Sequence, residues 1–259
     1  MYLDGILARH RAAAAADRRD PDALRERARG AGPTRGFAAQ LRAEGASALA
    51  VIAEVKRRSP SRGDLAPGLD PAATARDYAR GGATCLSVLT DADAFGGSPD
   101  DLAAARAAVE LPVLRKDFTV DVRDVYDARI MGADAVLLIA AALEPARMAA
   151  CLAAAREAGL DALVEVHDGE ELAAALDAGA TMVGVNQRDL RTFEVDRGRA
   201  AALAPRIPAG VVRIAESGVR GADDARALRA CGYHAVLVGE GVVASADRAA
   251  AVAALRVRA

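Results

Sequence analysis

Charged side chains stand at the ends of apolar runs in this chain, where they could exchange protons with a ligand. Glu54 and Lys56 lie two residues apart at the end of the run 49–55, so both point to the same side of a strand. Lys116 follows a second apolar run, and Glu165 stands inside a third. Burying such charges is costly unless they form an ion pair or take part in a reaction, and the sequence alone leaves both interpretations open.

A lysine and a glutamate that meet in one cleft can serve as the acid and the base of a reaction at neutral pH. We expect burial to lower the pKa of such a lysine and to raise that of a crowded carboxylate. Asn186, Arg188 and Glu216 follow two further apolar runs and would add hydrogen-bonding groups to the same cleft. Because several runs end in this way, the pattern indicates an enzyme.

Small residues follow the last two apolar runs. Ser217 and Gly218 precede the helical stretch 221–230, and Gly239 and Glu240 precede the final helical stretch. Glycine lets backbone N–H groups approach an anion, and the start of a helix favours negative charge. Turn glycines without a ligand are the alternative to a phosphate site at these two loops.

The elements that would position these residues follow a repeating order. A helical stretch ends near a glycine, and a short apolar run begins within a few residues of it. Short continuous runs of this kind are typical of parallel strands buried on both faces. The expected strands are 49–55, 85–89, 112–114, 135–139, 162–166, 182–185, 211–215 and 235–238. The expected helices are 70–80, 99–109, 123–131, 144–157, 168–178, 196–204, 221–230 and 245–256.

Eight strands that alternate with helices predict an α/β fold, a closed (β/α)8 TIM barrel. An open doubly wound sheet is the alternative, but the chain has no early GxGxxG turn to support it. In a TIM barrel the active site lies at the carboxyl ends of the strands. The polar residues described above all stand at such ends.

Residues 1–48 have apolar residues at helical spacing and no strand-like run, and Ala31-Gly32-Pro33 divides them into two helical pieces. Phe37 and Leu41 form a short apolar stripe, which favours an ordered segment over a disordered tail. We therefore expect a single domain over 1–259. Its parts would be an N-terminal helical extension, 1–48, that covers one end of the barrel, and the barrel proper, 49–259.

Composition argues against several classes of function. The chain has 34 basic and 36 acidic residues and no tryptophan, so neither a basic surface nor an aromatic platform for nucleic acid is expected. No apolar stretch reaches the length of a membrane span. His10, His167 and His234 lie far apart without ligand spacing to the cysteines, so we expect no metal and interpret His10 and His234 as surface residues. The absence of a signal peptide and of paired cysteines predicts a cytoplasmic location.

Several motifs together resemble the indole-3-glycerol phosphate synthase family, and they occur in the order in which that family has them. The resemblance covers most of residues 37–243. Its motifs are Ala53-Glu54-Val55-Lys56 with Ser59-Pro60-Ser61-Arg62-Gly63, Ser87-Val88-Leu89-Thr90-Asp91 with Phe95-Gly96-Gly97-Ser98, Leu114-Arg115-Lys116-Asp117-Phe118, the segment 132–139, Leu163-Val164-Glu165-Val166-His167, Gly184-Val185-Asn186 with Arg188 and Leu190, and Glu216-Ser217-Gly218.

The resemblance implies a TIM barrel with an N-terminal extension and a reaction of tryptophan biosynthesis. The substrate would be 1-(2-carboxyphenylamino)-1-deoxyribulose 5-phosphate, and ring closure, decarboxylation and dehydration would convert it to indole-3-glycerol phosphate. Such an enzyme is a carboxy-lyase that needs no cofactor and no metal. Its partner would be this phosphorylated small molecule, and we expect a monomer or a weak homo-oligomer.

The resemblance also implies roles for individual residues. Lys116 would be the general acid and Glu165 the general base, and Lys56 would assist them. The groups that orient them or bind substrate hydroxyls would be Glu54, Asn186 and Glu216, those that grip the substrate and its aromatic ring would be Ser59, Phe118, Arg188 and Ser217, and those at the phosphate would be Gly218, Gly239 and Glu240.

The chain departs from the family's usual pattern after strands six and three, and one further acidic residue needs an explanation. Gln187 replaces an asparagine, and because its parity turns it away from the pocket we expect little effect. Arg123 and Asp124 replace Tyr-Gln, which leaves the packing of that loop open. Glu240 would repel a phosphate, so we expect its side chain to point away and its backbone alone to contact the ligand.

Two other functions stay open. A barrel resembling phosphoribosylanthranilate isomerase would use a cysteine on its first strand, and the run 49–55 contains none. A non-catalytic paralogue would keep the pocket but lack a lysine or a glutamate. All of the expected acid and base residues are present.

Overall fold

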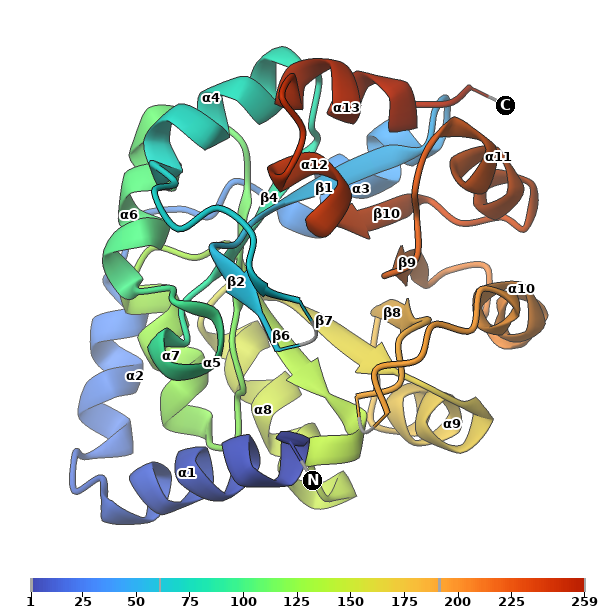
Figure 1. Ribbon diagram of the computed structural model, residues 1–259. Helices are drawn as coiled ribbons and strands as arrows, with labels where there is room; N and C mark the ends of the chain where they lie inside the picture. The colour runs from blue at the N-terminus through green and yellow to red at the C-terminus, as the bar shows by residue number, and fades with distance from the viewer. Residues whose placement is uncertain (1, 61, 191, 259) are drawn as a thin grey trace.

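The computed structural model describes residues 2–60, 62–190 and 192–258, and its eight long strands close into a parallel barrel (Figure 1). Closure is direct, because the first strand of the barrel pairs with both the second and the last. The strands are β1 (Ala50–Val55), β4 (Cys85–Leu89), β5 (Val113–Lys116), β6 (Ala135–Ile139), β7 (Asp161–Val166), β8 (Met182–Asn186), β9 (Val212–Glu216) and β10 (Ala235–Val238). The predicted TIM barrel is confirmed. Ser61 of the first motif lies outside the described residues.

Helices lie outside the strands and connect them (Figure 1). They are α4 (Pro71–Arg80), α6 (Pro99–Ala108), α7 (Val122–Ile130), α8 (Pro145–Glu157), α9 (Gly169–Asp177), α10 (Gly198–Leu203), α11 (Ala222–Ala230) and α13 (Arg248–Leu255). Several begin where the sequence supplies a cap: the side chain of Asp70 accepts from the backbone of α4, and that of Ser98 from α6, each just before a proline. None of the described helices is both long and apolar enough to cross a bilayer.

The shortest elements were not predicted from the sequence. A two-stranded antiparallel sheet, β2 (Arg58–Ser59) and β3 (Gly63–Asp64), follows β1, and the helices α5 (Ala92–Phe95) and α12 (Glu240–Val243) follow β4 and β10. Two 3-10 turns, η1 (Ala140–Ala142) and η2 (Ala204–Arg206), were also not expected. These pieces are too short to show a hydrophobic period. They all lie in connections between the long elements.

Alternation along β1 decides which side chains enter the barrel. Ala50 and Ile52 belong to the interior core, whereas Val51, Ala53 and Val55 belong to the layer between the strands and the helices. Glu54 shares the parity of Ala50 and Ile52 and therefore points inward. The carboxyl halves of neighbouring strands continue this arrangement, since several register pairs there include a charged or polar residue. These pairs are Glu54 with Ser87, Leu89 with Lys116, Ile139 with Glu165, and Asn186 with Glu216.

The N-terminal extension contains three helices, where two were predicted. They are α1 (Tyr2–Ala16), α2 (Pro21–Arg29) and α3 (Phe37–Gly45). The missed break lies at Asp20-Pro21, where Asp20 is extended and its side chain caps α2. A residue before proline disfavours the helical conformation, so this dipeptide was a readable signal.

The extension reaches both ends of the barrel, and the expectation that it covers one end was therefore too narrow. Helix α3 closes the amino-terminal end, where Phe37 and Leu41 are fully buried and Cys85 Sγ at the start of β4 donates to the carbonyl of Phe37 at 3.8 Å. Helix α1 lies at the opposite end, where Arg11 donates to the carbonyl of Ala142 at 2.8 Å, just beyond β6. Helix α2 packs against α7 and joins the two ends.

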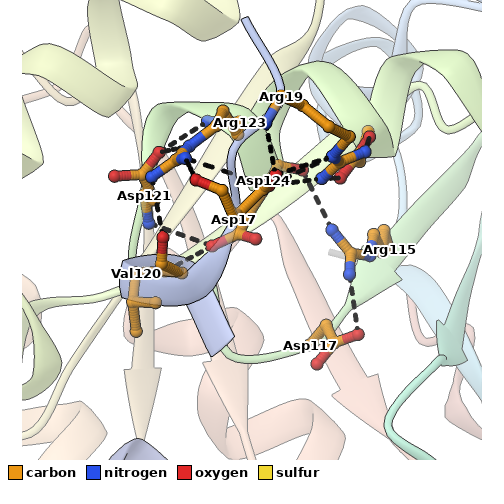
Figure 2. A network of polar contacts seen from close by, with 10 residues as sticks. Asp17, Arg19, Arg115, Asp117, Val120, Asp121, Arg123 and Asp124 are labelled. Carbon is orange, nitrogen blue, oxygen red and sulfur yellow. Dashed lines mark hydrogen bonds and ion pairs between the residues drawn. The ribbon is translucent and has the colours of Figure 1, made fainter. Parts of the chain in front are cut away.

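A polar network anchors the turn between α1 and α2 to the start of α7 (Figure 2). Arg123 donates to the carbonyls of Asp17 at 2.6 Å and Ala14 at 2.9 Å, and its Nε donates to Asp121 at 2.7 Å. Asp124 closes the capping box of α7 by accepting from the backbone of Asp121 at 2.9 Å. Of the two residues that depart from the family's pattern in this loop, Arg123 thus holds the extension in place, and Asp124 caps the helix that carries Arg123.

Replacing Arg123 with alanine should loosen α1. The variant loses two charged hydrogen bonds to backbone carbonyls, so we expect the free energy of unfolding to fall by about 2 kcal/mol and amide exchange in α1 to become faster. Urea denaturation and hydrogen exchange measure the two effects. Arg226→Ala is the control, because its pair with Asp223 is exposed and should contribute little. If the two variants had the same free energy of unfolding and the same amide exchange in α1, Arg123 would not anchor the extension.

Candidate active site

A cavity of about 470 Å³ opens at the carboxyl ends of the strands, and a smaller one of about 70 Å³ adjoins it. The two share part of their walls, including Lys116 and Asn186. All of the site residues predicted from sequence line one or the other, so the structure brings them together. The larger cavity holds Glu54, Lys56, Ser59, Lys116, Asn186, Arg188, Glu216, Ser217, Gly218, Gly239 and Glu240, and the smaller one adds Phe118 and Glu165.

Lys116 and Glu165 form the centre of the site. Lys116 Nζ lies 3.3 Å from Glu165 Oε2 and 3.9 Å from Glu216 Oε2. The other oxygen of Glu165 accepts a hydrogen bond from Asn186 Nδ2 at 3.0 Å. β5, β7, β8 and β9 therefore each supply one side chain to a single cluster. An ammonium beside a carboxylate can give a proton to a ligand on one side and receive one on the other.

The charge states of this pair follow from their neighbours, and the expected fall in the lysine pKa is wrong. Burial alone would lower the pKa of Lys116, but the side chains of Glu165, Glu216 and Glu54 outweigh it and raise that pKa above its ordinary value. Burial would likewise raise the pKa of Glu165, yet Lys116, His167 and the amide of Asn186 lower it. At neutral pH, Lys116 is therefore a protonated ammonium and Glu165 is an ionised carboxylate.

Glu216 is a crowded carboxyl with a raised pKa, as the sequence predicts for this site. Burial and the nearby charge of Glu165, with which it shares a hydrogen bond, raise its pKa well above the ordinary value. Its Oε1 has no hydrogen-bond partner among the described residues and lies against the backbone of Gly184, where a Cβ would collide with it. A protonated Glu216 relieves the repulsion from Glu165 and can donate a hydrogen bond.

Glu54 and Lys56 form a second ion pair at the end of β1. Lys56 Nζ lies 2.7 Å from Glu54 Oε1, and Ser87 Oγ donates to the other oxygen at 3.3 Å. Burial would raise the pKa of Glu54, but Lys56 and Lys116 lower it. Gly239 packs against this pair, since a Cβ there would collide with the carboxylate of Glu54 and lie 3.0 Å from Lys56 Nζ. Glycine at 239 therefore allows backbone, carboxylate and ammonium to meet.

The loop after β9 has an uncommon backbone conformation. Ser217 and Gly218 have φ angles of 65° and 75°, so both occupy the left-handed region, which is uncommon for a residue other than glycine. Gln187 Nε2 donates to the carbonyl of Ser217 at 2.8 Å. Gln187 does point away from the cavity, as its parity predicts, but it supports this turn from beneath. Parity along the strand predicted the direction of the Gln187 side chain but could not predict its hydrogen bond with Ser217.

Arginines line the mouth of the larger cavity near this turn. Arg197 and Arg220 belong to its lining and were not among the predicted residues. Arg188 Nη2 lies 3.3 Å from Glu240 Oε1, and Arg62 Nε lies 3.4 Å from the other oxygen. The side chain of Glu240 thus stays at the rim and does not point away. Pairing with two guanidinium groups removes the repulsion on which the contrary expectation was based.

The smaller cavity is apolar on the side away from Lys116. Phe118 and Phe95 have ring centroids 6.2 Å apart, and Leu137, Ile139 and Leu190 complete that wall. A flat aromatic group fits such a wall, with the charged pair at its edge.

His10 of α1 reaches the back of this wall, so its interpretation as a surface residue was wrong. Its ring centroid lies 5.5 Å from that of Phe118, and Nε2 lies 2.9 Å from Asp91 Oδ2. His10, Asp91 and Asp117 offer ligand atoms within 4.8 Å of one another, as a metal site would. Arg9 also pairs with Asp91, and Arg115 with Asp117 at 2.9 Å, so arginines already bind both carboxylates.

Comparison with known proteins agrees with these features. A model of the family described as indole-3-glycerol phosphate synthase matches residues 3–255. A Streptomyces coelicolor protein named indole-3-glycerol phosphate synthase 2 is 58% identical over 224 residues, which make up 86% of this chain and 86% of that protein. An indole-3-glycerol phosphate synthase of Chlorobium phaeovibrioides is 48% identical over 248 residues, or 95% of this chain and 96% of that one.

Solved structures with low sequence identity share the barrel. A thiamine phosphate pyrophosphorylase from Pyrococcus furiosus aligns with a TM-score of 0.61 at 18% identity, over 80% of this chain and 93% of that one. An N-acetylmannosamine-6-phosphate 2-epimerase from Clostridium perfringens aligns with a TM-score of 0.59 at 14% identity, over 74% and 86% of the two chains. At such identities the likeness concerns the fold alone.

Replacing Glu216 with glutamine should stabilise the protein at alkaline pH. A folded carboxyl with a raised pKa binds its proton more tightly than the unfolded chain does, so its contribution to stability is present below the ordinary pKa of 4.5 and is lost as pH rises through the folded pKa. Glutamine stays neutral, so the free energy of unfolding of the variant should exceed that of the wild type at pH 8 by more than about 1 kcal/mol.

Urea denaturation between pH 4 and pH 8 measures this difference, which should shrink toward the acid end. Glu110→Gln is a suitable control because the Glu110 side chain is 98% exposed. If Glu216→Gln left the pH dependence of stability unchanged, Glu216 would not be protonated in the folded protein.

Proposed function

The chain belongs to the indole-3-glycerol phosphate synthase family, and from this premise we propose how its own residues carry out the family's reaction. It is a carboxy-lyase of tryptophan biosynthesis that converts 1-(2-carboxyphenylamino)-1-deoxyribulose 5-phosphate to indole-3-glycerol phosphate, CO2 and water. The observation that carries the assignment of roles is the ion pair of Lys116 with the buried Glu165, which lies where the apolar and the charged cavities meet.

The shape and charge of the two cavities support one orientation of the substrate. Its aromatic ring would lie against Phe118 in the smaller cavity, because that wall is apolar. Its phosphate would lie at the turn of Ser217 and Gly218 and at the backbone of Gly239 and Glu240 in the larger one. The polyol chain between them would then pass the Lys116 cluster.

Two basic side chains would hold the ring carboxylate and the start of the chain. Arg188 is the first, because it lines the mouth and is paired with Glu240, which a substrate carboxylate can replace. Lys56 is the second, and Ser59 lies beside it in the lining as a hydroxyl donor. Arg188 is also fixed from its backbone, whose N–H donates to Asn186 Oδ1 at 2.9 Å.

The ammonium of Lys116 would act as the acid in ring closure. The aromatic carbon that bears the carboxylate attacks the ketone carbon, and the ketone oxygen becomes an alkoxide that needs a proton. Lys116 holds its proton at neutral pH because carboxylates surround it, and it can release that proton to a strongly basic alkoxide. Loss of CO2 then restores the aromatic ring.

In the dehydration step, Lys116 would again act as the acid and Glu165 would act as the base. The new hydroxyl leaves as water and takes a second proton from Lys116, while Glu165 removes a proton from the neighbouring methylene carbon. Glu165 is ionised and can accept it. Glu54 balances Lys56, and protonated Glu216 would bind a substrate oxygen.

The alternatives are less consistent with these findings. The relatives that match most of the chain are named indole-3-glycerol phosphate synthases. A non-catalytic paralogue has no need for an ammonium surrounded by three glutamate side chains. The cytoplasmic location, the absence of a nucleic-acid partner, the absence of a metal and the monomeric or weakly associated state stay predictions of the sequence.

A Lys116→Arg variant should show whether the reaction needs the proton of Lys116 or only its positive charge. Arginine keeps the positive charge beside Glu165, but its guanidinium does not give up a proton in proteins. We expect kcat to fall by about 10² to 10⁴-fold, as in Lys116→Ala, in a steady-state assay that follows product fluorescence.

Lys56→Arg is the matched control, since the role proposed for Lys56 needs charge and not proton transfer. It should keep far more activity than Lys116→Arg. Near-wild-type turnover by Lys116→Arg would refute Lys116 as the acid, and lack of turnover by the wild type would refute the function itself.

Glu165→Gln should allow ring closure and decarboxylation but block dehydration. Glutamine keeps the hydrogen bond with Asn186 but cannot take a proton from the methylene carbon, so the ring-closed species that still carries its hydroxyl should accumulate. Quenching the reaction and measuring masses detects this species as product plus water. A product profile identical to that of the wild type would exclude Glu165 as the base.

A further inference from the structure

The reaction consumes one proton in each turnover. The ketone oxygen leaves as water and gains two protons, whereas the methylene carbon releases one. The released proton can return from Glu165 to Lys116, which lie 3.3 Å apart, but the second must come from elsewhere. Both groups lie inside the barrel, with side-chain exposures of 16% for Lys116 and 1% for Glu165, and a bound substrate would cover the cavity beside them.

His167 stands next to Glu165 on the side away from the lysine. It follows β7 directly, and its Nε2 lies 3.7 Å from Glu165 Oε1. That nitrogen is buried and has no hydrogen-bond partner among the described residues. The only described carboxylate oxygen within ion-pair distance of it is that of Glu165, so a small movement of either side chain would join the two.

Glu171 fixes the opposite side of the imidazole. Its Oε2 lies 3.1 Å from His167 Nδ1 and accepts the backbone N–H of His167 at 2.7 Å. The ring is thereby oriented with Nε2 toward the site. The charged groups that act on it are Glu165 on β7 and Glu171 on α9, which favour the imidazolium, and Arg199 on α10, which disfavours it. The two carboxylates outweigh burial and Arg199, so the pKa of His167 is raised.

We propose that His167 stores the proton that the reaction consumes and delivers it to the catalytic pair through Glu165, a role that rests on the proposed function. The Nε2–H bond of the imidazolium breaks, its electron pair stays on nitrogen, and an O–H bond forms at Glu165 Oε1. The protonated carboxyl group of Glu165 then turns, so that the same proton faces Lys116; it passes to Lys116 Nζ and leaves Glu165 ionised again. After the product leaves, water in the emptied cavity returns a proton to the imidazole by way of the same carboxylate. His167 is thus a positioning and relay residue that need not touch the substrate.

His167→Gln tests the proposal by removing the titratable ring. We expect kcat to fall on the order of ten-fold, below the effect of losing a direct proton donor, with KM little changed. Added imidazole buffer should raise the kcat of the variant in proportion to its concentration, because a small acid can replace the missing proton source. The wild type should not respond.

Glu171→Gln is the second variant, because its amide oxygen can still accept the backbone N–H of His167. Loss of the charge lowers the pKa of His167, so the pH at which kcat begins to fall on the alkaline side should move to lower values than in the wild type. Circular dichroism checks that both variants are folded.

The outcomes separate this relay from a structural role and from failure of the function. Loss of activity in His167→Gln without imidazole rescue and with an unchanged pH profile would assign His167 a structural role and overturn the relay. Wild-type kcat at every pH in His167→Gln would also overturn it. Absence of turnover in the wild type would instead remove the proposed function.

Discussion

The ammonium of Lys116 among carboxylates is the interaction on which this site depends. Moving a single charge out of water costs several kcal/mol, and a partner offsets that cost only where the geometry is close. Here Glu165 is that partner, at 3.3 Å. The remaining charges then balance: Lys56 neutralises Glu54, and Glu216 avoids a third negative charge by holding its proton. Each group therefore has a charge state that its neighbours determine, and no single one can be altered without changing the others.

The closed barrel is what makes such a cluster possible. Glu54, Lys116, Glu165, Asn186 and Glu216 are spread over most of the sequence, and each is carried to the same end by its own strand. Inward parity places each on the interior side, and small residues make room for them. Gly184 accommodates Glu216, and Gly239 accommodates the pair of Glu54 and Lys56. The outer layer of helices and the plug formed by Phe37 and Leu41 supply the apolar burial that offsets this polar interior.

Much of this arrangement could be predicted from local sequence. Apolar run length and helix-ending glycines identified the eight strands within two residues at either end, and parity identified which charged residues face inward. Two kinds of property could not be obtained in this way. The direction of the Lys116 pKa shift depends on three glutamates from other strands, and only closure of the barrel brings them near. Contacts across loops, such as Gln187 with Ser217 and His10 with Phe118, likewise depend on how distant segments meet.

The positions at which this chain has lysine and not arginine have a physical meaning. The chain has 34 lysines and arginines, yet only two are lysine, and these are Lys56 and Lys116. Arginine supplies charge and hydrogen bonds everywhere else, including the anchor at Arg123 and the mouth of the cavity. A guanidinium cannot give up a proton at any pH that a protein meets, whereas an ammonium can. In a chain that otherwise uses arginine for positive charge, lysine marks the positions where a compact charge or a transferable proton matters. Lys116, with Glu165 on one side and the cavity on the other, has the surroundings that proton transfer requires.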